Sequence, residues 1–179
     1  MTNTKTKDVL YCDEKELLEI MEDSVRATFQ SFLGFKPEVI QAVRDRKEAL
    51  GEKSDAPTIS GSVAFLQKNF EGTLSISFNR ESAIQLFQVI YQEEINSVDD
   101  NRVVEGIAEL ANIIHGMVKE NLNLRGYDYK MCLPVVIIGK NHAIFHDKNS
   151  PGLSVLFKTQ FGKFSVEVLS QDPAAKDVA

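Results

Sequence analysis

The sequence predicts a two-layer α/β (α+β) fold in which a mostly antiparallel sheet packs against long helices. Two observations support this class. Segments with apolar residues at helical spacing are followed by shorter segments that alternate in polarity and are rich in β-branched residues. The order also repeats weakly, since each half runs helix, strand, strand, and GTLSISF (72–78) is comparable with GLSVLFK (152–158). We therefore expect two similar half-units that share one sheet.

The first half is expected to contain one long helix and one β-hairpin. Apolar residues recur at helical spacing over residues 13–33, and Asp13 is the expected N-cap of this helix. Residues 37–57 are interpreted as a short second helix that gives way to a charged linker. The stretches TISGSVAFLQ (58–67) and EGTLSISF (71–78) alternate in polarity around a short polar turn, which is typical of a hairpin.

The second half is expected to begin with helices and to end in strands. Residues 79–92 predict a helix capped by Asn79, and the longest helix is expected from Asp99 or Asp100 to Leu124. The remainder is interpreted as strands with tight turns at glycines. These strands are KMCLPVVIIG (130–139), HAIFHD (142–147), GLSVLFKTQ (152–160) and GKFSVEVLS (162–170), with turns at Gly139, Gly152 and Gly162.

Length and composition indicate a single domain. At 179 residues, with 43% hydrophobic and 26% charged residues, the chain is suited to one full core. We expect this domain over residues 12–170, with a disordered N-terminus over 1–11 and a flexible tail over 171–179. The formal net charge of −6 and the lack of a basic run argue against binding to nucleic acid or to an anionic membrane. With no signal-peptide pattern and no membrane span in the sequence, a cytoplasmic location is expected.

The cysteines and histidines do not predict a metal site. Cys12 and Cys132 lie in different segments and are interpreted as reduced thiols that fill space. His142 and His146 are four residues apart in a segment of strand and turn, where this spacing does not bring two side chains to a shared metal. They are interpreted as surface histidines, and no metal is expected on this chain.

The longest expected helix carries two stripes. The buried stripe recurs at steps of three and four: Val103, Ile107, Leu110, Ala111, Ile114, Val118 and Leu122. A second stripe, at similar steps, consists of Glu105, Glu109, Asn112 and Gly116, whose side chains should point the same way. A glycine inside a helix costs about 1 kcal/mol relative to alanine, and it is often tolerated where another surface comes close. On the residues alone, a solvated surface is the commoner explanation, and a recognition surface is the alternative.

The run EGIAELANIIHGMVKENL (105–122) resembles the signature helix of the CheC/CheX/FliY family of chemotaxis phosphatases, and it is most similar to that of CheX. The resemblance extends, with less specific residues, to CLPVVIIGKNH, SVLFKTQFGKFSVEVL, SGSVAFLQKNFEGTLSISF and LLEIMEDSVRATFQSFLGF. It implies a CheC/CheX-like fold with an exposed Glu-x-x-Asn motif. It also implies a phosphatase that removes the phosphoryl group from an aspartate of a CheY-like response regulator.

Carried onto this sequence, the motif implies two catalytic residues. Asn112 would position the attacking water, and Glu109 would pair with a lysine of the receiver domain. Glu105, Gly116 and His115 are the further residues expected to contact this partner. The resemblance also implies a homodimer, and a Mg²⁺ ion that is bound by the receiver and not by this chain.

Two departures from the family pattern stand out. Family members often have Asp or Ser at the position of Glu105, so the role of that residue is open. In EIMED (19–23), Glu22 stands where a second Glu-x-x-Asn would have Asn, and that half is expected to be inactive. Two alternatives also stay open: a CheX-like module that binds a receiver or senses without turnover, and a structural motor component of the FliY type.

Overall fold

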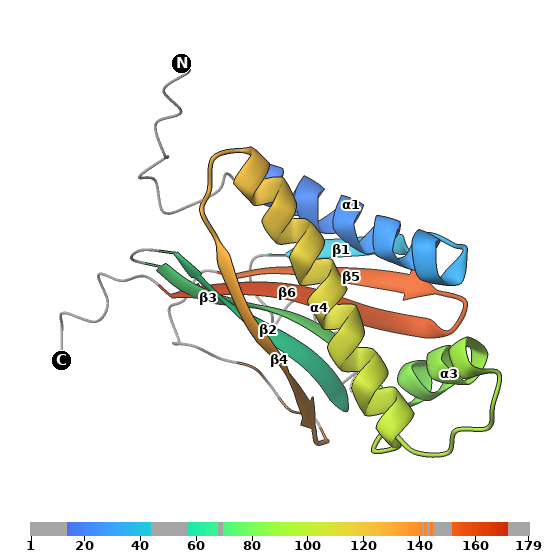
Figure 1. Cartoon of the computed structure of the whole chain (residues 1–179). Coiled ribbons are helices and arrows are strands. Elements are labelled where there is room, and N and C mark those ends of the chain that lie inside the picture. The colour runs from blue at the N-terminus through green and yellow to red at the C-terminus, as the bar shows by residue number, and fades with distance from the viewer. Residues whose placement is uncertain are drawn as a thin grey trace.

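The protein folds into one antiparallel sheet with its two long helices on one face (Figure 1). The computed structural model describes residues 14–43, 57–67, 70–140, 142, 144 and 152–171. The predicted fold class is confirmed. Within the described residues the elements are α1 (Glu14–Leu33), β1 (Glu38–Val43), β2 (Ile59–Gln67), β3 (Phe70–Phe78), α3 (Arg80–Tyr91), α4 (Asn101–Leu124), β4 (Lys130–Ile138), β5 (Gly152–Thr159) and β6 (Gly162–Gln171).

The sheet order is β1-β5-β6-β3-β2-β4, and all neighbouring strands are antiparallel. When the sheet is followed inward from its two edges, β1 corresponds to β4, β5 to β2, and β6 to β3. Each half therefore contributes a long helix and three strands, and the first strand of each half borders the hairpin of the other half. Because β3 matches β6 in this arrangement, the comparison of 72–78 with 152–158 in β5 is wrong.

Residues 38–43 form strand β1, so the short helix expected after Pro37 is wrong for this stretch. The run EVIQAV is apolar but too short for its periodicity to separate helix from strand. Pairing with β5 makes this stretch a strand, with Val39 opposite Phe157 and Val43 opposite Ser154. This pairing gives β5 a neighbour that lies far away in the sequence, which local patterns do not reveal.

Other expected features are reproduced or fall outside the described residues. Asn79 caps α3 by accepting a hydrogen bond from the Ser82 amide, as expected. Gly162 lies in a turn with a positive φ of 115°, whereas Gly152 is a paired residue of β5 and not a turn residue. Outside the description lie the linker 44–56, Asp13, Cys12, His146, most of 142–147 and both terminal segments apart from Gln171.

The core lies between the helices and one face of the sheet. All seven residues of the predicted buried stripe of α4 are buried, as expected. Gly61 on β2 lets α4 come close, since an added Cβ there would lie 2.7 Å from the Ile107 carbonyl oxygen and 2.9 Å from Ala111 Cβ. On the α1 side, Phe29 stacks on Phe164 with ring centroids 4.8 Å apart. Because the core holds one side of α4 this tightly, its opposite side is set to face outward.

Candidate functional site

The second stripe of α4 lies on its outward face, as the sequence predicts. Glu105 and Glu109 are exposed, and Asn112 and Gly116 are partly exposed. Within the described parts of the chain, the side chains of Glu105, Glu109 and Asn112 make no hydrogen bond or ion pair. One carboxylate and one carboxamide therefore stand one turn apart with all their hydrogen-bonding capacity available to another molecule.

Two glycines of α4 differ in what surrounds them. An added Cβ at Gly106 would clash with the Phe87 ring of α3, so the packing of α3 on α4 requires this glycine. An added Cβ at Gly116 would meet no atom within 4 Å. The fold of this chain therefore does not require Gly116, and the space above it is open to a second molecule.

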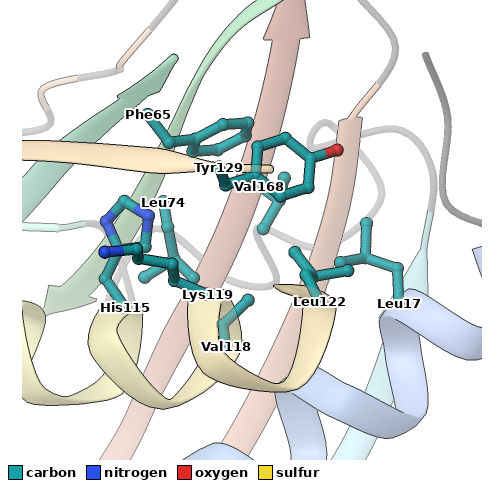
Figure 2. A pocket seen from close by; sticks show the side chains of 9 residues that line it. All are labelled: Leu17, Phe65, Leu74, His115, Val118, Lys119, Leu122, Tyr129 and Val168. Carbon is teal, nitrogen blue, oxygen red and sulfur yellow. The ribbon is translucent and has the colours of Figure 1, made fainter. Parts of the chain in front are cut away.

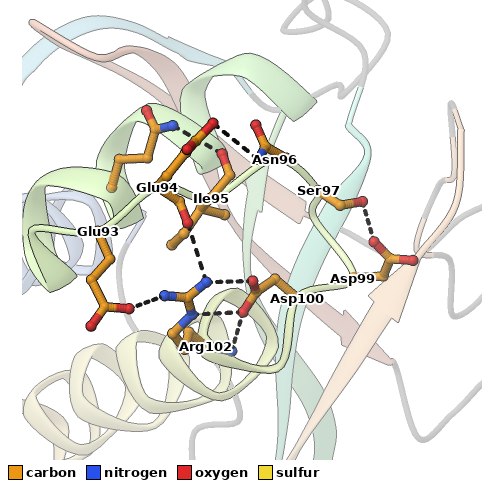
Figure 3. A network of polar contacts seen from close by, with 9 residues as sticks. Glu93, Glu94, Ile95, Asn96, Ser97, Asp99, Asp100 and Arg102 are labelled. Carbon is orange, nitrogen blue, oxygen red and sulfur yellow. Dashed lines mark hydrogen bonds and ion pairs between the residues drawn. The ribbon is translucent and has the colours of Figure 1, made fainter.

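The N-terminal end of α4 is held by a network of polar contacts (Figure 3). The Asp100 side chain accepts from the Arg102 amide at 3.0 Å and from Arg102 Nε at 2.9 Å. The Arg102 guanidinium also pairs with Glu93 and donates to the Glu94 carbonyl oxygen. Its hydrogen bonds hold the pKa of the Asp100 carboxyl at about 2. Arg102 could not be predicted from the sequence, because its contacts with Glu93 and Glu94 depend on the path of the loop after α3.

The C-terminal half of α4 is held against α1. Arg125 Nε, just past the end of α4, lies 2.9 Å from Glu16 Oε1. The Thr28 hydroxyl, which is bonded to the Ser24 carbonyl oxygen at 2.8 Å, also lies 3.3 Å from Met117 Sδ. The outward stripe therefore sits on a helix that is fixed along its whole length, which favours precise placement of its side chains.

His115 is buried and does not belong to the outward stripe. Its side chain is only 2% exposed and packs edge-on against Phe65, with ring centroids 5.6 Å apart. It lines a largely apolar cavity of about 30 Å³ that Lys119 and Tyr129 also border (Figure 2). Burial, and to a lesser extent the Lys119 charge, lowers the pKa of His115 to about 4. The expected partner contact of His115 is wrong, because a neutral core residue cannot reach another protein.

The remaining candidates stay apart from the outward stripe. On α1, Glu22 pairs with Arg26 at 3.1 Å. Cys132 is a free thiol that lies exposed on β4, so the expectation that it fills space is wrong. His142 is only partly exposed: its Nε2 lies 2.6 Å from Ser60 Oγ and its Nδ1 lies 2.9 Å from the Gly139 carbonyl oxygen. This histidine therefore lies only partly at the surface.

The described residues contain neither a cluster of metal-ligating side chains nor a membrane-spanning helix. No three His, Cys, Asp or Glu side chains among them are placed to hold a metal ion. None of the helices described here is both long enough and apolar enough to cross a membrane.

The family model named "Chemotaxis phosphatase CheX" matches residues 59–158, more than half of the chain. The chain belongs to the CheX family. The matched region runs from the start of β2 into β5, so it contains the whole of α4 and its outward stripe. No curated protein sequence matches the chain at a significant level.

Solved structures of CheX proteins share this fold. CheX from Vibrio vulnificus is 21% identical with a TM-score of 0.74, over 87% of this chain and 99% of that one. CheX from Desulfovibrio desulfuricans is 22% identical with a TM-score of 0.73, over 87% and 99%. The CheX–CheY–BeF₃–Mg²⁺ complex from Borrelia burgdorferi matches at 22% identity and a TM-score of 0.71, over 87% and 98%. At these identities the structural likeness shows the fold alone.

Proposed function

We propose that this CheX-family chain hydrolyses the aspartyl phosphate of a CheY-like receiver domain in chemotaxis or two-component signalling. The observation that carries the proposal is the pair of Glu109, which is exposed, and Asn112, which is partly exposed, on a fixed helix and without polar contacts to the described part of the chain. Family membership supports it, as does a CheX from Borrelia burgdorferi solved together with CheY. Because receivers of this kind are cytoplasmic proteins, the proposal also places the chain in the cytoplasm.

Asn112 is proposed to position the attacking water. An aspartyl phosphate is a mixed anhydride that is already primed for hydrolysis, so the main requirement is a water held in line with the scissile P–O bond. A carboxamide can accept a hydrogen bond from that water and donate one to a phosphoryl oxygen. Catalysis by placement of this kind can supply several kcal/mol without a strong base.

Glu109 is proposed to fix the docking register. An exposed carboxylate one turn before Asn112 can pair with the lysine that a receiver carries beside its phosphorylated aspartate. Mg²⁺ is proposed to bind the receiver's own acidic cluster, where it supplies neutralisation of phosphoryl charge. On this chain the stripe offers one amide and separate carboxylates, which is not the convergent oxygen set that Mg²⁺ requires.

We also propose that two copies of the chain pair along β4. This strand lies at an edge of the sheet, and its side chains Leu133 and Val135 are 86% and 60% exposed. An exposed apolar edge strand is a template for pairing with another chain. Pairing at this edge leaves the outward face of α4 open to a receiver. Light scattering at micromolar concentration should report a dimer, and a uniform monomer would contradict the proposal.

The function is tested by phosphate release from the phosphorylated receiver domains of the same cell. The chain should accelerate release from at least one of them, and EDTA should remove the acceleration. Binding of a phosphorylated receiver without faster release would favour the non-catalytic binding module. Calorimetry of the chain alone should detect no binding of Mg²⁺, whereas tight stoichiometric binding would favour a self-contained metallohydrolase.

A further inference from the structure

The last turn of α3 carries exposed apolar side chains beside the proposed site. Val89, Ile90 and Tyr91 are 53%, 37% and 39% exposed. Figure 1 shows α3 beside the N-terminal end of α4. Clusters of exposed apolar side chains commonly mark interaction surfaces, whereas single exposed apolar residues are ordinary.

Packing joins this turn to the helix of the proposed site. The Tyr91 ring stacks on Phe87, with centroids 6.3 Å apart and an interplanar angle of 28°. The Phe87 ring in turn occupies the space where a side chain at Gly106 would stand. Gly106 follows Glu105 on α4, so this packing holds the last turn of α3 beside the half of α4 that carries the outward stripe.

The loop after α3 is also held in place. Gln88 Nε2 donates to the Ile95 carbonyl oxygen at 2.9 Å, and Arg80 donates to the Asn96 carbonyl oxygen at 2.8 Å. From the other side, Arg102 holds Glu93 and the Glu94 carbonyl oxygen (Figure 3). The last turn of α3 and the loop that follows it are therefore ordered before any partner arrives, which lowers the entropic cost of binding.

This region contains most of the net charge of the chain. Residues 80–112 include seven acidic and two basic side chains, a net charge of −5 out of −6 for the whole chain. The apolar turn is bordered on this side by two exposed carboxylates, Glu93, which pairs with Arg102, and Glu94. Its electrostatic complement is an apolar patch flanked by lysine or arginine side chains.

The usual size of a protein interface favours the receiver domain as the partner that binds the last turn of α3. The outward stripe from Glu105 to Gly116 extends about 16 Å along the helix. A specific protein complex buries several hundred Å² per partner, more than four short side chains supply. We propose that Val89, Ile90 and Tyr91, with Glu93 and Glu94, form the second contact for the receiver, and that this contact takes an apolar patch bordered by basic side chains. The proposal rests on the proposed function, because the same partner must occupy both surfaces.

The test compares Val89→Asp with the wild-type chain in two assays. Binding is measured to a receiver domain activated with BeF₃⁻ and Mg²⁺, and turnover is measured with the phosphorylated receiver. Val89 is exposed, so the variant should fold normally, and circular dichroism checks this. We expect Kd and KM to rise at least 10-fold while kcat at saturation stays within about 2-fold. The matched control is Leu124→Asp, a change of an 80% exposed residue at the far end of α4, which should leave Kd, KM and kcat unchanged.

Two outcomes overturn the inference. One is an unchanged Kd and KM for Val89→Asp. The other is a changed oligomeric state with an unchanged Kd, because that result makes a second copy of this chain the occupant. Failure of the proposed function is distinguishable, since it means that the wild-type chain releases no phosphate even while Val89→Asp weakens receiver binding.

The charge component has a separate test. Raising NaCl from about 0.05 to 0.5 M should weaken receiver binding by the wild-type chain, because added salt screens exposed charges. Glu94→Gln should reduce this salt dependence. A Kd that is insensitive to salt would overturn the basic character assigned to the partner patch.

Discussion

The two long helices occupy matching places in the two halves of the fold, yet their outward faces differ. On α1, Glu22 is paired with Arg26 one turn further along. On α4, Glu109 and Asn112 stand at the spacing of one turn and make no polar contact with the described part of the chain. We therefore expect the same position in a repeated fold to be ordinary surface in one half and a recognition site in the other, because only in the first half does the chain pair these polar groups with its own side chains.

The inner faces of the two helices also differ, and acid should reveal the difference. The buried polar side chains of α1 in the described structure are Ser24 and Thr28, whereas α4 buries His115. The pKa of His115 is lowered from 6.5 to about 4 in the folded protein. As the pH falls, His115 is therefore protonated in the unfolded chain before it is protonated in the folded one. The contribution of neutral His115 to the stability of the fold is complete above pH 6.5 and is lost as the pH falls toward 4.

We expect this loss to amount to about 3 kcal/mol, since one pKa unit corresponds to about 1.4 kcal/mol. Urea unfolding at several pH values between 7 and 4 measures it. The variant His115→Phe should flatten the pH dependence in this window. An equal pH dependence in the variant and the wild-type chain would show that His115 is not its source.

The carboxylates of the two outward faces provide a direct comparison. Glu109→Ala should lower kcat/KM for the phosphorylated receiver by about 10-fold or more, because truncating one partner of a hydrogen-bonded ion pair at an interface is costly. Glu19→Ala, the matching change on α1, should leave kcat/KM unchanged. Both residues are exposed, so neither change should alter unfolding by more than about 0.5 kcal/mol. Equal losses for the two variants would contradict the assignment of the site to α4 alone.

Substitution of Gly116 by alanine should raise the stability of the protein and lower its activity. Gly116→Ala should stabilise the protein by up to about 1 kcal/mol, because alanine is the better helix former and its Cβ meets no atom within 4 Å. If a receiver approaches closely at this point, the added methyl group should lower phosphatase activity several-fold. Thermal unfolding and phosphate release on the same samples measure both effects. A variant that is more stable and fully active would remove Gly116 from the interface.

Sequence patterns predicted the helices and the hairpins well because their signals are local. Asn79 and Asp100 cap their helices, and the buried stripe of α4 follows a regular helical period. Strand β1 was not predicted, since its six residues become a strand only through pairing with the distant β5. The matching of strands between the halves was wrong for a similar reason, because edge strands are exchanged between halves and sequence order does not reveal this.

The outward position of the stripe on α4 could be predicted from the sequence, but the surroundings of the candidate site could not. Glu105, Glu109, Asn112 and Gly116 share a face by helical geometry alone. His115 was expected to contact the partner because it neighbours the motif, and only packing against Phe65 on β2 shows that it is buried. The apolar turn of α3 was also missed, since its place beside α4 depends on contacts between Phe87 and Gly106.

The most direct test of the central claim is phosphate release by Asn112→Ala. The control is Glu120→Ala, a change at an exposed position on the same face of α4, one turn beyond Gly116. At saturating phosphorylated receiver, kcat for Asn112→Ala should fall at least 100-fold, while Kd for the BeF₃⁻-activated receiver and thermal stability stay near the wild-type values. Glu120→Ala should retain full activity. Wild-type turnover by a folded Asn112→Ala chain would contradict the proposal that this carboxamide positions the attacking water.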